Sequence, residues 1–335
     1  MSEKKKLLNI GIIGYGLIGK KRSLCLGKKA KLVAVCDVNQ KRINEVKKKK
    51  IKEFKNWKNI FSVNNLDILI ISTPHNMLAK IIEFGIKKNK INLFVEKPGV
   101  KNFSEIKRIL KIYNHAKTKI KIKFGFNHRY HESVVLAKQL IKNNQVGKLM
   151  YLRGVYGHGG NKDYKKEWRG RKEYSGGGEL LDQGIHLIDL SRFFLGEFSS
   201  IKSDLNTFFR NTKVEDNAFL ILKSKKKLAF LHASWTEWKN RLLIEIFGKK
   251  GKIEIYGKGG SYGIETLTLY KMIKNKEKPL KKIWVFKDNL KSWKSELEEF
   301  YKEIKGKKNS SKKNLKNVYE NFKIINQIYQ KNDHS

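Results

Sequence analysis

Two acids and a histidine lie at helical spacing near the middle of the chain. In the segment L-L-D-Q-G-I-H-L-I-D-L, Asp182, His186 and Asp189 occupy positions i, i+4 and i+7, so a helix would place them on one face. Glycines 176–178 precede the segment and would let the backbone approach a ligand closely. The rest of the segment is mostly apolar, and buried polar groups need partners or a purpose. Histidine exchanges protons near neutral pH and a nearby acid can orient its ring, so the pattern predicts a proton-transfer site. The alternative is that His186 only satisfies an acid in the core.

A lysine before a proline is the second candidate for chemistry. Lys97 follows an apolar run in F-V-E-K-P-G. The residue before proline is pushed out of the helical region into an extended conformation. This predicts that Lys97 stands at the carboxyl end of a strand, over the crevice where α/β sheets bind ligands. Its ammonium could hydrogen-bond a hydroxyl there and stabilise a developing alkoxide. An exposed lysine in a strand-to-helix turn would have the same sequence.

A glycine pattern joins two apolar runs near the N-terminus, I-G-I-I-G-Y-G-L-I-G and K-L-V-A-V-C-D. This is the layout of a dinucleotide-binding βαβ unit. Gly14 would allow a tight turn, Gly16 the approach of a pyrophosphate, and Gly19 close packing of helix on strand. Asp37 ends the second run, where an acid would bind the ribose 2′-hydroxyl. The alternative is that the glycines only shape a sharp turn and that Asp37 caps a strand.

The charges around this unit bear on the choice of cofactor. A carboxylate at position 37 would repel a 2′-phosphate, which favours NAD over NADP. Arg42 follows five residues later and keeps NADP as the alternative. The run Lys20-Lys21-Arg22 opposes the helix dipole unless an anion sits at the helix start, and a bound diphosphate would relieve that conflict.

Length and periodicity predict two domains, since 335 residues exceed the size at which one core usually keeps growing. Up to residue 124, continuous apolar runs alternate with amphipathic segments. This predicts a Rossmann domain with a doubly wound parallel sheet covered by helices. Asn102 and Glu105 resemble a capping box. The expected strands are 8–13, 31–36, 67–72, 91–95 and 120–125, and the expected helices are 17–29, 40–50, 76–89 and 103–117.

Residues 125–335 are expected to form an α+β domain for substrate binding and oligomerisation. After a helix at 131–143, apolar and polar residues alternate as in antiparallel strands with one solvated face. We therefore expect a large, mostly antiparallel open sheet. Its expected strands are 149–157, 199–208, 215–223, 227–235, 241–248 and 252–256, with further helices at 179–194, 291–305 and 312–330.

The net charge of +43 is almost all lysine, spread along the chain. A basic surface binds phosphate non-specifically, but no nucleic-acid-binding motif accompanies it, so an AT-rich coding composition explains the charge better than a specific nucleic-acid partner. Cys25 and Cys36 lack metal-ligand spacing, so we expect reduced thiols and no metal site. No apolar run is long enough to span a membrane and no signal-peptide region follows Met1. We therefore expect a cytoplasmic protein with no membrane partner.

The ordered set of motifs resembles one family closely, the Gfo/Idh/MocA oxidoreductases, named after glucose–fructose oxidoreductase, inositol dehydrogenase and a rhizopine catabolism protein. The resemblance runs from G-I-I-G-Y-G-L-I-G through I-S-T-P, V-E-K-P and G-F-N-H-R-Y to G-G-G-E-L-L-D-Q-G-I-H-L-I-D, and covers nearly the whole chain. It implies a Rossmann domain followed by a domain whose open sheet often forms oligomer contacts. A homodimer or homotetramer is therefore expected.

The resemblance also implies roles for individual residues. Lys97, Asp182 and His186 look like the family's catalytic lysine, aspartate and histidine, with His186 as the proton acceptor. Residues bordering the cofactor include Thr73, Pro74 and Glu96, near its nicotinamide and ribose. The full set of expected cofactor-binding residues is Gly14, Gly16, Leu17, Ile18, Gly19, Asp37, Thr73, Pro74, Glu96 and Lys97.

One position departs from the family pattern. Many members carry a histidine four residues after the T-P proline, whereas this chain has Leu78 there and His75 directly after the proline. The departure leaves the catalytic lysine and histidine untouched but puts the nicotinamide-side contacts in doubt.

The loop 158–171 mixes aromatic residues and arginines with glycines. Aromatic faces stack on sugar rings, and arginine forks bind phosphate or carboxylate. The combination is similar to family members encoded with nucleotide-sugar and surface-polysaccharide pathways. We therefore expect Tyr164, Trp168 and Arg169, together with Arg129, to bind substrate. A solvated surface loop is the alternative.

Together these interpretations predict an NAD(H)-dependent oxidoreductase. It would transfer a hydride between nicotinamide and a secondary hydroxyl or keto carbon of a sugar, cyclitol or nucleotide-sugar. Lys97 would polarise the oxygen, His186 would take the proton, and Asp182 would orient the site. The alternatives are a family member acting on a non-sugar substrate and a non-catalytic NAD-sensing protein. The three intact catalytic residues count against the second alternative.

Overall fold

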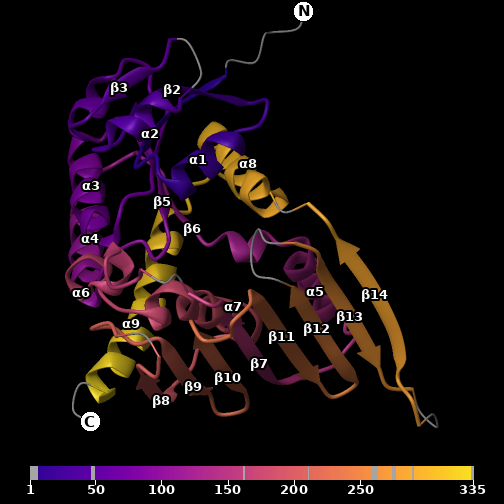
Figure 1. Cartoon of the computed structure of the whole chain (residues 1–335). Coiled ribbons are helices and arrows are strands. Elements are labelled where there is room, and N and C mark those ends of the chain that lie inside the picture. Colours follow the sequence, from indigo (N-terminus) through magenta and orange to yellow (C-terminus); the bar gives the residue numbers. More distant parts are fainter. Residues whose placement is uncertain are drawn as a thin grey trace, which may run out of the picture. The chain divides into compact units, whose positions relative to one another are not determined.

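The chain folds as two compact units. A computed structural model describes residues 7–46, 50–160, 163–209, 211–257, 263–273, 277–288 and 290–332. Unit 1 consists of Met1–Gly125 with Trp293–Glu320, and unit 2 of Phe126–Ser292 with Asn321–Ser335 (Figure 1). Unit 1 therefore contains a C-terminal stretch that the sequence prediction had assigned to the second domain.

Unit 1 is built on the predicted parallel sheet. Its six strands follow the order β3-β2-β1-β4-β5-β6, and every pair is parallel. The central strands are buried on both faces, which explains their continuous apolar sequences. Only β3 was missed, because this three-residue edge strand is mostly exposed and has no apolar run. The strands are β1 (Leu8–Ile13), β2 (Ala30–Cys36), β3 (Lys52–Phe54), β4 (Ile68–Ile71), β5 (Asn92–Glu96) and β6 (Ile122–Gly125).

The helices of the N-terminal stretch begin close to where the sequence predicts. Asn102 caps α4 by accepting a hydrogen bond from the Glu105 amide at 3.0 Å, and the Glu105 carboxylate accepts one from the Lys101 amide, so the predicted cap is confirmed. The second helix ends at Asn44, earlier than predicted, and residues 47–49 lie outside the described residues. The helices are α1 (Leu17–Leu24), α2 (Gln40–Asn44), η1 (Asn59–Ser62), α3 (His75–Lys88) and α4 (Phe103–His115), followed near the C-terminus by α8 (Lys291–Lys305) and α9 (Ser311–Asn332).

Unit 2 contains the predicted large open sheet. Its eight strands follow the order β14-β13-β12-β11-β7-β10-β9-β8, and only the β7–β10 pair is parallel. The last two strands were not predicted, because β14 is largely exposed and lacks a clear alternation. The strands are β7 (Leu149–Gly157), β8 (Ser200–Asn206), β9 (Asn217–Lys223), β10 (Leu228–Ser234), β11 (Arg241–Gly248), β12 (Gly251–Gly257), β13 (Glu265–Lys271) and β14 (Leu280–Phe286).

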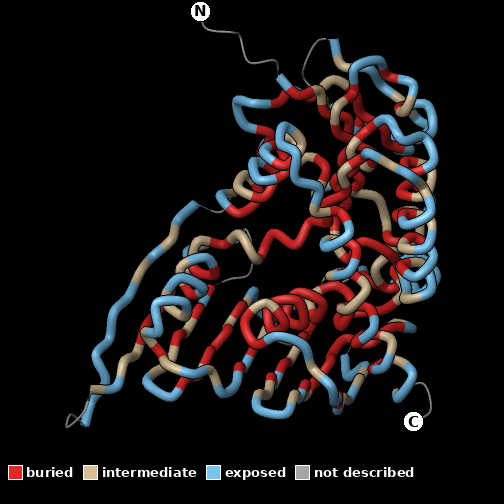
Figure 2. Tube along the Cα trace, turned by 180° about the vertical axis from the view of Figure 1, so that it is seen from behind, coloured by how far each residue is buried: buried red, intermediate tan, exposed pale blue. Residues whose placement is uncertain are grey.

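Helices cover one face of this sheet (Figure 1). Helix α7 packs on β7 and β10, and α5 packs on β12, β13 and β14. All residues of α7 except Phe193 are buried, as the burial view in Figure 2 illustrates. The helical elements of unit 2 are η2 (Asn127–Tyr130), α5 (Glu132–Lys142), η3 (Trp168–Gly170), α6 (Lys172–Ser175), η4 (Leu180–Gly184) and α7 (Ile185–Leu195).

The predicted single helix at 179–194 is in fact two elements. Residues Leu180–Gly184 form a π-helical turn, and the α-helix begins only at Ile185. A π-turn closes its hydrogen bonds over five residues instead of four. His186 and Asp189 both lie on the α-helix as expected, whereas the spacing from Asp182 to His186 crosses the π-helical turn.

No helix among the described residues is both long and apolar enough to cross a membrane.

Candidate functional site

The first candidate region lies where β1 and β4 end, at the centre of the six-stranded sheet. The chain leaves these neighbouring parallel strands toward opposite edges, which makes their carboxyl ends the topological switch point where open α/β sheets bind ligands. The Ser72 amide donates to the Ile13 carbonyl at 2.8 Å, and the Ser72 hydroxyl donates to the Gly14 carbonyl at 2.7 Å. The glycine turn and the β4–α3 loop are thus fastened to each other.

The three positions of the turn are glycines for different structural reasons. Gly14 has a φ of +86°, and a Cβ there would lie 2.6 Å from the Ser72 carbonyl oxygen. A Cβ at Gly19 would lie 2.0 Å from the Gly14 carbonyl oxygen. At Gly16, by contrast, the nearest atom to an added Cβ is an Arg42 nitrogen at 3.6 Å, an ordinary contact. The fold itself requires Gly14 and Gly19, whereas the described residues leave space in front of Gly16.

Asp37 is held beside the turn, directly after β2. Its Oδ2 accepts from the Tyr15 amide at 2.7 Å and its Oδ1 from the Asn39 amide at 2.8 Å. An ionised carboxylate has about four lone-pair positions, so it retains capacity for further donors such as ribose hydroxyls. Arg42 Nη1 lies 3.5 Å from Oδ2, and its side chain is half exposed. Burial, and after it the charge of Asp37, raises the pKa of the neighbouring Cys36 thiol to about 12.

Two buried polar atoms after β4 have no hydrogen-bond partner among the described residues. They are Thr73 Oγ1 and Asn76 Oδ1. Buried polar atoms are normally satisfied, so atoms left open at a switch point indicate a ligand or water. With the open space at Gly16 and the free amides of the α1 N-terminus, these atoms fit a bound dinucleotide. Thr73 was predicted from the sequence, but Asn76 was missed, because an asparagine in a helix start carries no distinctive signal.

The contacts of the basic residues at the start of α1 do not support the interpretation that a bound diphosphate relieves their conflict with the helix dipole. Arg22 is completely buried and pairs with Glu96 and with Glu296 at 2.8 Å. Lys20 pairs with Glu45. Protein carboxylates, and not a cofactor phosphate, therefore compensate the charge of Arg22, and this interpretation of the sequence is corrected.

The remaining predicted cofactor residues lie at the same ends of the sheet strands or on α1. Lys97 directly follows β5 and is partly exposed, while Glu96 is buried against Arg22. Leu17 opens α1 and is 68% exposed, an unusual state for a leucine. Two other predicted cofactor residues are partly exposed, namely Ile18 in α1 and Pro74, the N-cap of α3. His75, the first residue of α3, is buried.

In unit 2, His186 lies in a cluster of aromatic rings. It is 3% exposed, and its ring centroid is 4.0 Å from that of His128 and 6.0 Å from that of Tyr156. His128 in turn stacks on His131 at 4.7 Å, and His131 Nδ1 lies 2.8 Å from Glu265 Oε2. These contacts fix the plane of the His186 imidazole, which is what proton transfer in a fixed direction needs. The role of His128 was missed, since it lies 58 positions away in the sequence.

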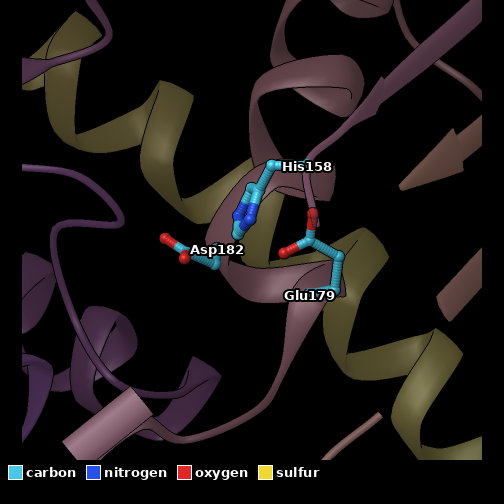
Figure 3. A group of neighbouring side chains, drawn as sticks. All are labelled: His158, Glu179 and Asp182. Atoms are coloured by element: carbon cyan, nitrogen blue, oxygen red, sulfur yellow. The ribbon is translucent and has the colours of Figure 1, made fainter. Parts of the chain in front are cut away.

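Asp182 lies in a group of charged side chains that the sequence did not predict. Its carboxylate, the Glu179 carboxylate and the His158 imidazole have ligand-type atoms within 4.8 Å of one another. Figure 3 shows the imidazole between the two carboxyl groups. Arg169 Nε lies 3.5 Å from Asp182 Oδ2, which places one of the predicted substrate residues beside this acid. The acid between the glycines and the leucines of G-G-G-E-L-L-D was the available sequence signal for Glu179.

Asp189 and Arg129 form a structural ion pair. Arg129 donates to both carboxylate oxygens of Asp189, at 2.6 and 2.8 Å, and Asn321 donates to the same carboxylate at 3.0 Å. The second of the two acids predicted to share a helix face, Asp189, is therefore explained by this pair. The predicted substrate arginine at 129 is already engaged by protein.

The aromatic residues of the loop 158–171 have core and surface positions. Tyr164 is 6% exposed and stacks on buried Trp235 at 4.3 Å, with the rings 8° from parallel. Trp168 is partly exposed, and the Arg169 guanidinium lies over its ring at 4.6 Å. Residues 161 and 162 of the loop lie outside the described residues. Of these aromatic side chains, Trp168 remains the better placed for a substrate.

The glycines before η4 also serve the fold. A Cβ at Gly177 would lie 1.8 Å from the Tyr329 hydroxyl, and one at Gly178 would lie 2.0 Å from the Glu215 carbonyl oxygen. At these glycines the backbone therefore lies close to other residues of the chain, where a close approach to a ligand was expected.

The structure therefore assembles two separate groups of predicted residues. The cofactor residues gather at the strand ends of unit 1, and Asp182, His186 and Arg169 lie in unit 2. Lys97 belongs to unit 1 and His186 to unit 2.

Comparison with known proteins agrees with this division. Residues 8–124 match the profile "Oxidoreductase family, NAD-binding Rossmann fold", and residues 134–254 match the "GFO/IDH/MocA C-terminal domain". Levoglucosan dehydrogenase of Pseudarthrobacter phenanthrenivorans is 29% identical over 60% of this chain, and the match spans only 54% of that enzyme. Myo-inositol 2-dehydrogenase of Thermotoga maritima is 25% identical over 73% of this chain and 74% of its own length.

A solved structure extends the likeness to the whole fold. Levoglucosan dehydrogenase in complex with NADH and levoglucosan has a TM-score of 0.84 over 98% of both chains, at 20% identity. The first profile spans the parallel sheet, and the second spans the open sheet from β7 to the middle of β12. The chain belongs to the GFO/IDH/MocA family of NAD-binding oxidoreductases.

Proposed function

We propose that this chain is an NAD(H)-dependent dehydrogenase that acts on a secondary hydroxyl or keto carbon of a sugar or cyclitol. The observation that carries the proposal is the cradle at the switch point of unit 1, with its space at Gly16 and its open polar atoms at Thr73 and Asn76. The names of the relatives, a levoglucosan and a myo-inositol dehydrogenase, support a polyhydroxylated substrate. A nucleotide-sugar and a role in surface-polysaccharide metabolism remain the finer alternative within the same proposal.

The proposed cofactor is NAD(H). Its pyrophosphate would face Gly16 and the N-terminus of α1, and its ribose hydroxyls would bind Asp37. When bound, the nicotinamide supplies hydride transfer. The carboxylate of Asp37 disfavours a 2′-phosphate, against the opposite influence of Arg42.

The catalytic roles follow from the chemistry of three side chains. The Lys97 ammonium would donate to the reacting oxygen and stabilise negative charge on it. His186 would take the proton of the hydroxyl, held in its plane by the neighbouring rings. Asp182 would fix the substrate by accepting hydrogen bonds from its hydroxyls, in its place beside Arg169.

Single-turnover hydride transfer tests this assignment. Lys97→Ala and His186→Ala should each lower the rate by about two to four orders of magnitude, the usual scale of general acid–base catalysis. NADH affinity should stay nearly unchanged, since neither residue is assigned to the pyrophosphate, and both variants should still fold, with a lower unfolding midpoint for His186→Ala because its ring is buried. The combined loss should be smaller than the product of the single losses if both act on one proton transfer. Near-normal rates in both single variants would exclude the mechanism.

A further inference from the structure

The turn that carries Lys97 begins at a carboxylate that is bound by a buried arginine. Arg22, in α1, is 0% exposed, and its Nε donates to Glu96 Oε1. Its Nη2 donates to Glu296 Oε2 at 2.8 Å, and its Nη1 lies 3.5 Å from the Trp293 carbonyl oxygen. Each nitrogen of the guanidinium therefore has an acceptor, and one of these acceptors belongs to the residue directly before Lys97 in the chain.

Neighbouring residues fix the position of this guanidinium. The Arg22 Cζ atom lies 4.4 Å from the Phe94 ring centroid and 4.3 Å from the Trp293 ring centroid. Gly125 is paired with Glu96 where β6 runs beside β5, and a Cβ there would lie 2.9 Å from Arg22 Nη2 and 3.0 Å from Glu96 Oε2. The glycine at the end of β6 thus leaves the space that the ion pair occupies.

The turn itself is held at both of its ends. The Gly99 amide donates to the Glu96 carbonyl at 3.0 Å. Gly99 has a φ of +96°, and a Cβ there would lie 2.8 Å from the Phe124 ring, so the backbone packs closely on β6 at this point. Lys97 stands between these two fixed positions. The backbone that directs its side chain is therefore tied to α1 through Glu96 and Arg22.

Stability alone does not explain this buried group of charges. Replacing a buried ion pair with apolar side chains of similar volume is often neutral or stabilising, because the desolvation of the charges offsets their attraction. Glu296 Oε1 has no hydrogen-bond partner among the residues that the structure describes, which adds to the cost of burial. The geometry that the charges impose on the Lys97 turn is the better explanation.

We propose that Arg22 is a positioning residue for Lys97, because its hold on the Glu96 carboxylate sets where the Lys97 ammonium stands relative to α1. The inference rests on the proposed function and adds a buried residue to its mechanism. The N-terminus of α1 is assigned to the cofactor, so this link aligns cofactor and lysine within unit 1. Precise alignment matters, since a displacement of about 1 Å at a reacting group can cost on the order of a hundredfold in rate.

Arg22→Lys tests the inference in the full chain. Lysine keeps the charge, but its single ammonium cannot reproduce the planar fork that binds two carboxylates and stacks between two rings. We expect hydride transfer to slow by about ten- to a hundredfold. The half-saturating sugar concentration and the NADH dissociation constant should stay nearly unchanged, because the glycine turn and Asp37 keep their contacts. The measurement is single-turnover NADH formation from NAD⁺ with glucose or myo-inositol.

A double-mutant cycle separates positioning from general structural damage. In the Lys97→Ala background the lysine no longer contributes, so adding Arg22→Lys should have little further effect on the rate. Loss of packing around α1 would instead slow hydride transfer by the same factor in both backgrounds.

Glu96→Gln asks the same question should Arg22→Lys fold poorly. It keeps the shape of the side chain and removes the charge that Arg22 binds, so the same dependence on Lys97 is expected. Arg108→Lys is the matched control within unit 1, where Arg108 pairs with Glu83 at 2.7 Å and has a side chain that is 51% exposed. The control should transfer hydride at the wild-type rate.

The outcomes distinguish this inference from the proposed function. Unchanged rates in Arg22→Lys and Glu96→Gln, or equal losses with and without Lys97, would overturn the inference and leave the dehydrogenase standing. A wild-type chain that forms no NADH with any sugar or cyclitol would contradict the proposed function, and the inference would fall with it.

Discussion

At the scale of single residues, the structure distinguishes glycines that the fold requires from a glycine that a ligand requires. Gly14 and Gly19 have no room for a side chain, because main-chain oxygens lie 2.6 and 2.0 Å from the position of an added Cβ. Gly16 has an extended backbone and only an ordinary contact with Arg42. Its lack of a side chain is therefore best explained by the approach of a pyrophosphate.

Gly16→Val tests this distinction. The substitution should abolish NADH binding while the unfolding midpoint changes little, because an added Cβ makes only an ordinary contact with the partly exposed Arg42 side chain. Titration of NADH by fluorescence together with thermal unfolding measures both effects. Gly19→Val is the contrasting variant and should fail to fold. Retained NADH affinity in Gly16→Val would show that the pyrophosphate does not pass this position.

A second prediction at this scale concerns Asp37 and the choice of cofactor. NADH should bind more tightly than NADPH, because the carboxylate repels a 2′-phosphate. Asp37→Ser should narrow the difference, with Arg42 then free of its acidic neighbour at 3.5 Å. Parallel titrations with the two cofactors measure the ratio. An unmodified protein that prefers NADPH would refute the assignment.

At the scale of elements, one buried arginine joins α1, β5 and α8. Arg22 pairs with Glu96 at the end of β5 and with Glu296 on α8, and its guanidinium lies 4.4 Å from the Phe94 ring centroid and 4.3 Å from that of Trp293. Breaking a buried ion pair by removing one partner is costly, because the other charge stays buried. The cofactor helix is thus anchored to the sheet and to the C-terminal helix by charge as well as by packing.

Arg22→Met should lower the free energy of unfolding by about 3–5 kcal/mol, since it leaves two buried carboxylates without their cation. Denaturant unfolding measures this loss.

Glu296→Gln should lower the free energy of unfolding much less than Arg22→Met. Burial raises the pKa of Glu296 to about 7, so the folded protein takes up a proton between the ordinary value of 4.5 and 7, and stability falls as the pH rises through this window. Glu296→Gln should flatten that slope in denaturant unfolding. An unchanged slope would contradict the assignment.

At the scale of the whole molecule, the face of the large sheet opposite α5 and α7 is rich in exposed apolar residues. Large patches of this kind mark interaction surfaces in soluble proteins. The exposed fractions are 44% for both Phe230 and Tyr256, 51% for Ile283 and 53% for Val285. The family resemblance assigns oligomer contacts to this sheet, so a homodimer or homotetramer through it is the corresponding proposal.

Light scattering coupled to size-exclusion chromatography tests the proposed oligomer. The wild-type chain should elute as a dimer or tetramer, and Phe230→Lys with Ile283→Lys should shift it toward the monomer. Leu24→Lys is the control, because that residue is also an exposed leucine, at 73%, but belongs to α1 of unit 1. A monomeric wild type would exclude this role of the sheet.

The sequence alone determined the cofactor half of the molecule in most of its detail. Gly14, Gly16, Gly19 and Asp37 lie within one βαβ unit, and their contacts are set by local backbone geometry. Strands buried on both faces and strands with one solvated face leave different patterns, so both sheet types were predictable. Only the tertiary structure decided which charged side chains form ion pairs within the protein. The partners Arg22–Glu296 and Arg129–Asp189 are separated by 274 and 60 positions, and no local pattern encodes a pairing over such distances. The π-helical turn at Leu180–Gly184 was not predicted either, because a helical pattern read from sequence assumes α-helical spacing throughout.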